Sequence, residues 1–237
     1  MAKLLKFIFS LPIWIIFWIN ATISIAFFVL ISFIIPKKFY NPLVVFVCKF
    51  LTYSLFIFPV CKGKSPKEVG FPVIYVANHV TFFDLFICGS VLPGYPRGLE
   101  LKSHFTKPIY GWFITRFGEI PLDTKNRTSI KESFLAMSRI LKNKERSILV
   151  MPEGKRSRDG KIQEFKYGAF HLSRLSGAPI VPVVFKRLYD RNNPTSLMIK
   201  PGSFDVIIMD EVKPEDFEDD DSMGNYVRNL MINKLEE

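Results

Sequence analysis

The 237-residue sequence is poor in cysteine and histidine, and it has no acidic residue before Glu68. Its three cysteines, Cys48, Cys61 and Cys88, have neither a paired nor a metal-ligand spacing. That spacing excludes a disulfide framework and is typical of a reducing compartment. Residues 7–36 contain no charged side chain at all, so this segment cannot be an ordinary solvated surface element.

The uncharged run is rich in Ile, Phe and Trp and is longer than the roughly 20 residues that cross a bilayer core. It is also too long for a signal peptide, and no small-x-small cleavage site precedes Pro36. A second apolar run, residues 43–60, is interrupted only by Lys49. All charged residues before Glu68 are lysines, which suits anionic lipid headgroups. We therefore predict a membrane-anchoring helical segment over residues 1–61.

Two arrangements of this anchor fit the sequence. One is a single span, tilted because a helix over the uncharged run would be about 44 Å long at ~1.5 Å per residue, against a ~30 Å hydrocarbon core. The other is a helical hairpin that dips into one leaflet, with Pro12 near the entry and Asn20 near the bend. Lysines flank the run on both sides and give no orientation. A buried helical hairpin in a soluble protein is a third interpretation.

From residue 62 to residue 237 the pattern is that of an α/β domain. Short apolar runs without polar alternation are separated by amphipathic segments, which predicts a mostly parallel central sheet flanked by helices. Strands are expected at residues 73–77, 98–102, 119–122, 147–151, 179–185 and 204–209. Helices are expected at residues 82–92, 107–117, 166–177 and 222–235, with another that begins at a capping box of Ser129 and Glu132.

Two expected strands end in polar loops, where ligands bind in parallel sheets. The first is the stretch VIYVANHVTFFD, residues 73–84, which delivers His79 and then Asp84. A carboxylate there would fix the imidazole tautomer, so the pair could serve as a general base for an alcohol. A histidine that caps a helix start has the same pattern. His104 and His171 have no acid close after them, and we interpret them as surface or structural.

The second loop, PEGKRSRDG, is strongly basic. A guanidinium forms a bidentate fork with phosphate, so a phosphorylated ligand is the natural interpretation, and a solvated basic loop is the alternative. Glu153 directly follows a buried strand and Pro152, which places it at the rim of the sheet. Nucleic acid is the other generic partner for basic proteins, but no basic stripe with interleaved aromatics is present. The cations of this loop are Lys155, Arg156, Arg158 and Lys161.

Four segments in order over residues 73–184 resemble the motifs of the glycerolipid acyltransferases, the family that includes 1-acylglycerol-3-phosphate acyltransferases. NHVTFFD is similar to the first motif, an Asn-His pair with Asp five residues after the His. GEIPLD followed by TKNR resembles the second, MPEGKRSRDG the third, and APIVPVV the fourth.

The resemblance implies transfer of an acyl group from acyl-CoA or acyl-carrier protein to the free hydroxyl of 1-acylglycerol-3-phosphate, which gives phosphatidic acid. His79 would be the base and Asp84 its orienting acid. Glu153, Gly154 and Arg156 carry over as contacts to the acceptor. The donor is a substrate, and neither a metal nor another cofactor is implied.

Two positions depart from the family pattern, and both concern the phosphate site. The Arg that usually follows the Asp of the second motif is Thr124 here, which leaves Lys125 or Arg127 to supply the charge. The usual Thr of the third motif is Lys155. Lys102 matches one of two lysines that often precede the second motif.

Alternative interpretations follow from these departures and from the chain's other residues. The acceptor is another lysophospholipid or a lyso-aminolipid, or the protein is a non-catalytic, membrane-anchored protein that binds anionic lipids. A covalent mechanism through Cys88 is a further rival. The expected partners are membrane lipids, a lysophosphatidic acid-like acceptor and an acyl-carrier protein, without nucleic acid. Soluble donors and a reducing compartment place the active site on the cytoplasmic side of the membrane.

Overall fold

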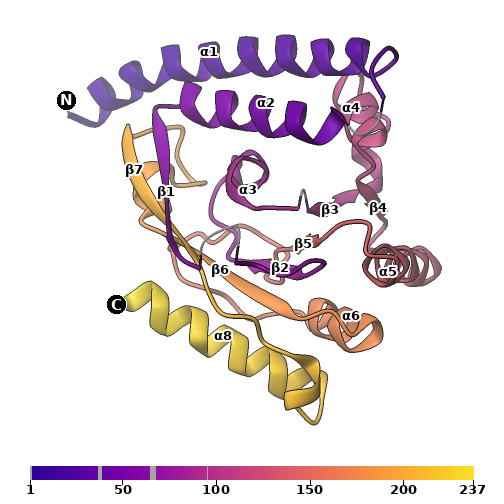
Figure 1. Ribbon diagram of the computed structural model, residues 1–237. Coiled ribbons are helices and arrows are strands. Elements are labelled where there is room, and N and C mark those ends of the chain that lie inside the picture. The colour runs from indigo at the N-terminus through magenta and orange to yellow at the C-terminus, as the bar shows by residue number, and fades with distance from the viewer. Residues whose placement is uncertain (1, 37–38, 65–67, 95) are drawn as a thin grey trace.

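A computed structural model describes residues 2–36, 39–64, 68–94 and 96–237 (Figure 1). The helices are α1 (Ala2–Ile31), α2 (Tyr40–Ser54), α3 (Asp84–Val91), α4 (Tyr110–Phe117), α5 (Arg127–Lys142), α6 (Gly168–Ser176), α7 (Leu188–Arg191) and α8 (Asp220–Glu236). Short 3-10 helices occur at Lys102–His104 and Pro214–Asp216. The strands are β1 (Ile57–Gly63), β2 (Ile74–Ala77), β3 (Arg97–Leu101), β4 (Ile120–Leu122), β5 (Ile148–Val150), β6 (Ile180–Lys186) and β7 (Gly202–Ile208).

The strands form one seven-stranded sheet in the order β1-β7-β6-β2-β5-β3-β4. Neighbouring strands in this sheet run parallel, apart from β6 and β7, which pair antiparallel. The α/β fold with a mostly parallel sheet, predicted from the apolar runs, is confirmed.

The central strand β2 explains why these runs lack polar alternation. Its side chains are all fully buried, because both faces of the sheet are covered. Tyr75 and Ala77 face a core shared with α1 to α4, whereas Ile74 and Val76 face a second core shared with α5, α6 and α8. Figure 1 shows the two layers, with α1 and α2 on one side of the sheet and α6 and α8 on the other.

The start of α5 differs from the prediction. Asn126, not Ser129, caps the helix, and its side-chain oxygen accepts the N–H groups of Thr128 and Ser129 at 3.0 and 3.2 Å. The predicted capping box of Ser129 and Glu132 is therefore wrong. Asn is at least as good a cap as Ser, and it occurs first along the chain, so the helix begins there.

The strand β1 was missed in the sequence. It lies at the edge of the sheet, pairs with β7, and leaves Phe58 and Val60 partly exposed, at 43% and 42%. Because apolar side chains of this edge strand are exposed, its sequence does not alternate between apolar and polar residues. In the sequence the strand therefore looks like the end of the second apolar run, residues 43–60. The expected boundary between residues 61 and 62 lies inside this strand.

The N-terminal segment also differs from the predicted bend. The helix α1 is continuous through Pro12 and Asn20, so a hairpin with its bend at Asn20 is wrong. The chain instead reverses direction between α1 and α2, and these two helices pack against each other.

One face of α1 is buried and the other is exposed. Phe17 and Phe28 are fully buried within the core shared with α2, α3 and α4, whereas Phe9, Ile23 and Leu30 are mostly exposed. By length and composition α1 is apolar enough to cross a bilayer. Of this apolar stretch 33% is buried, and α1 packs against α2 and α4.

Candidate functional site

The first polar loop leaves the sheet at a point fixed by Asn78. Its side-chain oxygen accepts the N–H of Phe185 at 2.8 Å, and its amide donates to the carbonyl of Phe185 at 3.4 Å. These contacts extend the pairing of β2 with β6 beyond Ala77 and Val183. The loop that follows therefore starts from a rigid position, although the sequence alone assigned no role to Asn78.

His79 and Asp84 form the predicted pair. The distance from His79 Nδ1 to Asp84 Oδ2 is 2.7 Å, and Asp84 is the first residue of α3, where the helix dipole favours a negative charge. The Asp84 side chain is 1% exposed, whereas that of His79 is 26% exposed. Because the carboxylate can only accept, it assigns the proton to Nδ1 and leaves Nε2 with a free lone pair.

The carboxylate of Asp84 is held by three further donors. It accepts the N–H of Val80 at 2.7 Å, the N–H of Thr81 at 3.0 Å and the hydroxyl of Thr81 at 2.9 Å. Neither oxygen can rotate away without breaking several of these bonds, so the orientation of the His79 ring is fixed. Thr81 was missed in the sequence, although its hydroxyl lies three residues before the acid, a spacing typical of local capping contacts.

Glu153 holds the backbone of His79. Its Oε1 accepts the N–H of His79 at 2.7 Å and its Oε2 accepts the N–H of Gln163 at 2.9 Å. The N–H of Ser157 donates to the carbonyl of His79 at 2.8 Å. The loop after β5 thus forms hydrogen bonds with both the N–H and the carbonyl of His79. Burial raises the pKa of Glu153, and the two backbone N–H groups oppose that shift.

Three predicted residues of this loop lie in different surroundings. Glu153 is buried and both its oxygens serve backbone groups. Gly154 has φ +66°, a left-handed backbone conformation that favours glycine. Arg156 is exposed. Their contact with an acceptor stays a prediction.

A basic pocket of about 780 Å³ lies beside this loop. Among the described residues, its three cations make no ion pair with an acid of the protein. Its one acid, Asp159, has a lowered pKa because the Lys161 N–H and the Ser157 hydroxyl donate to it. The pocket therefore offers uncompensated positive charge to an anion. It is lined by Lys155, Arg156, Arg158, Asp159, Gln163, Pro194 and Thr195.

Lys102 and Arg127, the other predicted phosphate contacts, are not among the residues that line the basic pocket. Lys102 follows β3 and Arg127 begins α5 after β4. In the sheet these strands lie one and two places beyond β5. Both side chains are exposed, as is Lys125, and their role in binding stays a prediction.

An apolar cavity of about 30 Å³ lies between α2, α3 and α4. Cys88 lines it, and burial raises the pKa of this thiol well above its usual value, which disfavours the nucleophilic thiolate. Glu119 also lines it, and burial raises the pKa of this carboxyl to about 8. Within the described ranges, no group of three His, Cys, Asp or Glu side chains could hold a metal ion.

The other two histidines do have acidic partners. His104 Nδ1 contacts Glu100, four residues earlier, and His171 Nδ1 lies 3.1 Å from Asp220, 49 residues later in the chain. The sequence argument that only His79 has such a partner is therefore wrong, because it considered only acids that closely follow each histidine.

The sequence and structure were compared with those of known proteins. The Acyltransferase family model matches residues 59–186. A 1-acyl-sn-glycerol-3-phosphate acyltransferase of Saccharomyces cerevisiae is 32% identical over 172 residues, which cover 70% of this chain and 56% of that protein. The protein of that name from Cocos nucifera is 27% identical over 162 residues, which cover 68% of this chain and 52% of the relative. The chain thus spans about half the length of these curated relatives.

A solved structure shows the fold. The crystal structure of the 1-acyl-sn-glycerophosphate acyltransferase PlsC from Thermotoga maritima is similar, with a TM-score of 0.84. The match covers 98% of this chain and 96% of that one, at 22% sequence identity. The likeness therefore includes the N-terminal helices as well as the sheet.

Proposed function

Since the chain belongs to the Acyltransferase family, we propose that it transfers a fatty acyl group from a thioester donor to a lysolipid hydroxyl. The donor is acyl-CoA or acyl-carrier protein, the acceptor is 1-acylglycerol-3-phosphate, and the product is phosphatidic acid. The single observation that carries this proposal is the 2.7 Å contact between His79 and a buried, fully hydrogen-bonded Asp84. Relatives named for the same reaction support it.

The chemistry follows from the free lone pair on His79 Nε2. This nitrogen takes the proton of the acceptor hydroxyl while the oxygen attacks the thioester carbonyl, which forms a C–O bond and a tetrahedral oxyanion. Asp84 stabilises the imidazolium that results. Collapse of the intermediate breaks the C–S bond, and the leaving thiolate takes the proton back from Nε2. Transfer is direct, since the Cys88 thiol is buried in α3 with a raised pKa.

The basic pocket would bind the phosphate of the acceptor. Lys155 and Arg156 are exposed there, two and one residues before Ser157, whose N–H bonds the His79 carbonyl. A phosphomonoester on the acceptor would thus be held close to the base. Lys155 supplies a charge where the family pattern has Thr, which offsets the charge missing at Thr124.

We further propose that α1 lies in the membrane interface instead of crossing it. Its buried face packs on the domain, and its exposed face carries large apolar side chains that would enter the headgroup and acyl boundary. This arrangement keeps the site next to membrane-dissolved substrates. The reducing compartment that the unpaired cysteines suggest supports a site on the cytoplasmic side.

An acyl-transfer assay tests the proposal. Purified protein is given acyl-CoA or acyl-carrier protein with lysophosphatidic acid, another lysophospholipid or a lyso-aminolipid, and thiol release is followed. We expect transfer to lysophosphatidic acid, a loss of about 10³-fold in kcat for His79→Ala, and retained activity for Cys88→Ala. Equal rates with acceptors that lack a phosphomonoester would contradict the acceptor. Lipid binding without thiol release from either donor would favour a non-catalytic binding protein.

A further inference from the structure

The loop formed by residues 193–199 connects α7 to β7 and is closed at its neck. Asn192 and Ile199 form an antiparallel bridge, and the Asn192 side-chain amide donates to the carbonyl of Met198 at 3.2 Å. Inside the loop, Asn193 accepts the N–H and the hydroxyl of Thr195 at 2.8 and 2.7 Å. The loop is therefore a compact unit that its own hydrogen bonds hold together.

Two side chains of α1 bind this loop. The indole N–H of Trp14 donates to the carbonyl of Leu197 at 2.7 Å. The hydroxyl oxygen of Ser10 accepts the N–H of Ile199 at 3.0 Å and is itself 3.4 Å from the Ile199 carbonyl. Among the described residues, the other hydrogen bonds of this loop go to its own members or to its neck. The N-terminal helix thus fixes the loop, across more than 180 residues of sequence.

The tip of the same loop belongs to the basic pocket. Pro194 and Thr195 line it together with the cations of the loop after β5. Leu197, between the tip and the neck, is 57% exposed and apolar. The loop therefore has its tip at the basic pocket and its other end against α1.

Trp14 also contacts the segment between β2 and α3, which contains His79. The centroid of its ring lies 5.1 Å from the centroid of the Phe83 ring, and Phe83 directly precedes Asp84. Phe17, one turn further along α1, packs on the same Phe83 ring at 4.9 Å. The helix is consequently in contact with Phe83, next to Asp84, and with the loop whose tip lines the basic pocket.

We propose that Trp14 and Ser10 are positioning residues for the binding of the phosphorylated acceptor, because α1 holds the loop 193–199 as a wall of the basic pocket. This inference rests on the proposed function of that pocket and adds to it a role for α1 beyond membrane association. A wall that is fixed before the ligand arrives loses less conformational freedom on binding, so the bonds from α1 favour substrate affinity. Both residues act through the loop, to which they are hydrogen-bonded.

The experiment compares Trp14→Phe with Trp18→Phe. Trp18 lies on the exposed side of the same helix and is 49% exposed, so both variants remove one indole from the lipid-facing segment, but only the first removes a bond to the loop. Kinetics are measured with a short-chain, water-soluble lysophosphatidate, so that membrane partition does not enter. We expect Trp14→Phe to raise the KM for this acceptor about fivefold, the scale of one net hydrogen bond, with kcat changed less than twofold. Trp18→Phe should match the wild type.

Hydrogen exchange of residues 190–201 gives a second readout that needs no turnover. Both Trp14→Phe and Ser10→Ala should exchange faster there than Trp18→Phe, and the Ile199 amide should lose its protection in Ser10→Ala. Equal KM values in the two Trp variants, or unchanged exchange in the loop, would overturn the inference. If the wild type transfers no acyl group to any lysophosphatidate, the proposed function fails, and exchange in the loop still decides whether α1 holds it.

Discussion

Among the described residues two histidines pair with aspartate through the same atoms, yet in only one of these pairs is the acid buried. His79 Nδ1 lies 2.7 Å from Asp84, whose side chain is 1% exposed. His171 Nδ1 lies 3.1 Å from Asp220, with side chains that are 60% and 25% exposed. The pairing is therefore common to both regions, and the difference lies in what holds the acid.

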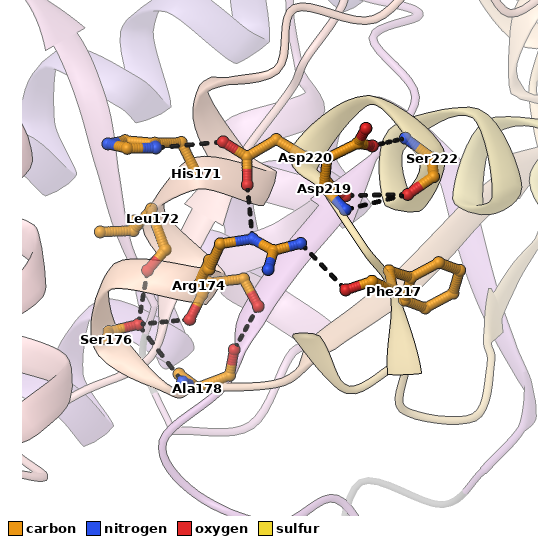
Figure 2. A network of polar contacts seen from close by, with 10 residues as sticks. His171, Leu172, Arg174, Ser176, Ala178, Phe217, Asp219, Asp220 and Ser222 are labelled. Atoms are coloured by element: carbon orange, nitrogen blue, oxygen red, sulfur yellow. Dashed lines mark hydrogen bonds and ion pairs between the residues drawn. The ribbon is translucent and has the colours of Figure 1, made fainter. Parts of the chain in front are cut away.

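The second pair joins two helices. Figure 2 shows His171 and Arg174, both on α6, reaching Asp220 at the start of α8. Arg174 Nε donates to Asp220 at 3.1 Å, and a terminal nitrogen of its guanidinium donates to the carbonyl of Phe217 at 3.1 Å. Here the acid is shared with an arginine at the surface. This arrangement ties α8 to α6 at the surface of the protein.

The first pair is held from both sides. Asp84 accepts from the backbone of its own loop, and Glu153 with Ser157 fixes the backbone of His79 from another strand end. Apart from the Thr81 hydroxyl, the donors are backbone N–H groups of the loops that follow β2 and β5. Rigid placement, more than the histidine and the acid as such, distinguishes this pair from the surface pair.

The largest effect is expected from exchanging one acid at a time for its amide. Asp84→Asn should lower kcat by about 10²-fold or more, because an amide no longer fixes the tautomer or stabilises the imidazolium. Asp220→Asn is the matched control and should leave kcat within twofold of the wild type. Steady-state acyl transfer under identical conditions measures both. A comparable loss in the two variants would show that pairing alone, and not burial, decides function.

A third carboxylate, that of Glu119, extends the comparison, because it should make the stability of the fold depend on pH. Glu119 is buried like Asp84, but among the described residues its carboxylate accepts one hydrogen bond, from the Gly98 N–H at 2.5 Å. Burial raises its pKa from 4.5 to about 8. Between these values the folded state keeps a proton that the unfolded state has lost, so this stabilisation is complete at low pH and is lost as the pH rises towards 8.

Glu119→Gln should remove that dependence. Relative to the variant, the wild type should lose about 1 kcal/mol of unfolding free energy per pH unit between pH 5 and 8, and the difference should level off above pH 8. Urea unfolding at several pH values measures it. Parallel curves for the two proteins would mean that Glu119 is ionised in the folded state at neutral pH.

A substitution at Glu153 tests whether its hydrogen bond to the His79 backbone affects kcat. In Glu153→Gln one of the two carboxylate oxygens becomes an amide nitrogen, which cannot accept the N–H it faces. We expect kcat to fall about tenfold while the KM for the acceptor stays within twofold, since both oxygens serve backbone groups. Glu164→Gln, at an exposed position of the same loop, is the control. A raised KM with unchanged kcat would instead support the predicted acceptor contact.

Much of the fold could be predicted from the sequence because its signals are local. The strand that ends at Ala77 is a run of buried side chains, and the turn at Gly118 has the left-handed conformation that closes α4. The edge strand β1 could not be predicted, since its residues are stabilised by pairing with β7, some 140 residues away. The continuous α1 was obscured by Pro12 and Asn20, which local rules treat as breaks.

The site divides in the same way. His79 and Asp84 are five residues apart in one motif, so the sequence alone indicated their contact. The hydrogen bond between Glu153 and His79 joins residues 74 positions apart, and the one from Trp14 to Leu197 joins residues 183 positions apart. No rule of local spacing predicts such contacts. The pairing of His171 with Asp220 was missed for the same reason. Long-range contacts became visible only once the sheet had placed its strand ends together.

The smallest effect should come from the surface pair. His171→Ala removes a contact between partly exposed groups, and such contacts contribute about 0–1 kcal/mol. Acyl transfer should stay within twofold of the wild type, and the coupling between His171→Ala and Asp220→Asn in a double-mutant cycle of unfolding free energies should be below about 1 kcal/mol. Arg174 keeps its own bonds to Asp220 and to the Phe217 carbonyl, so α8 stays attached to α6 in the single variant. A tenfold loss of transfer in His171→Ala, with the fold intact, would erase the distinction between the two pairs.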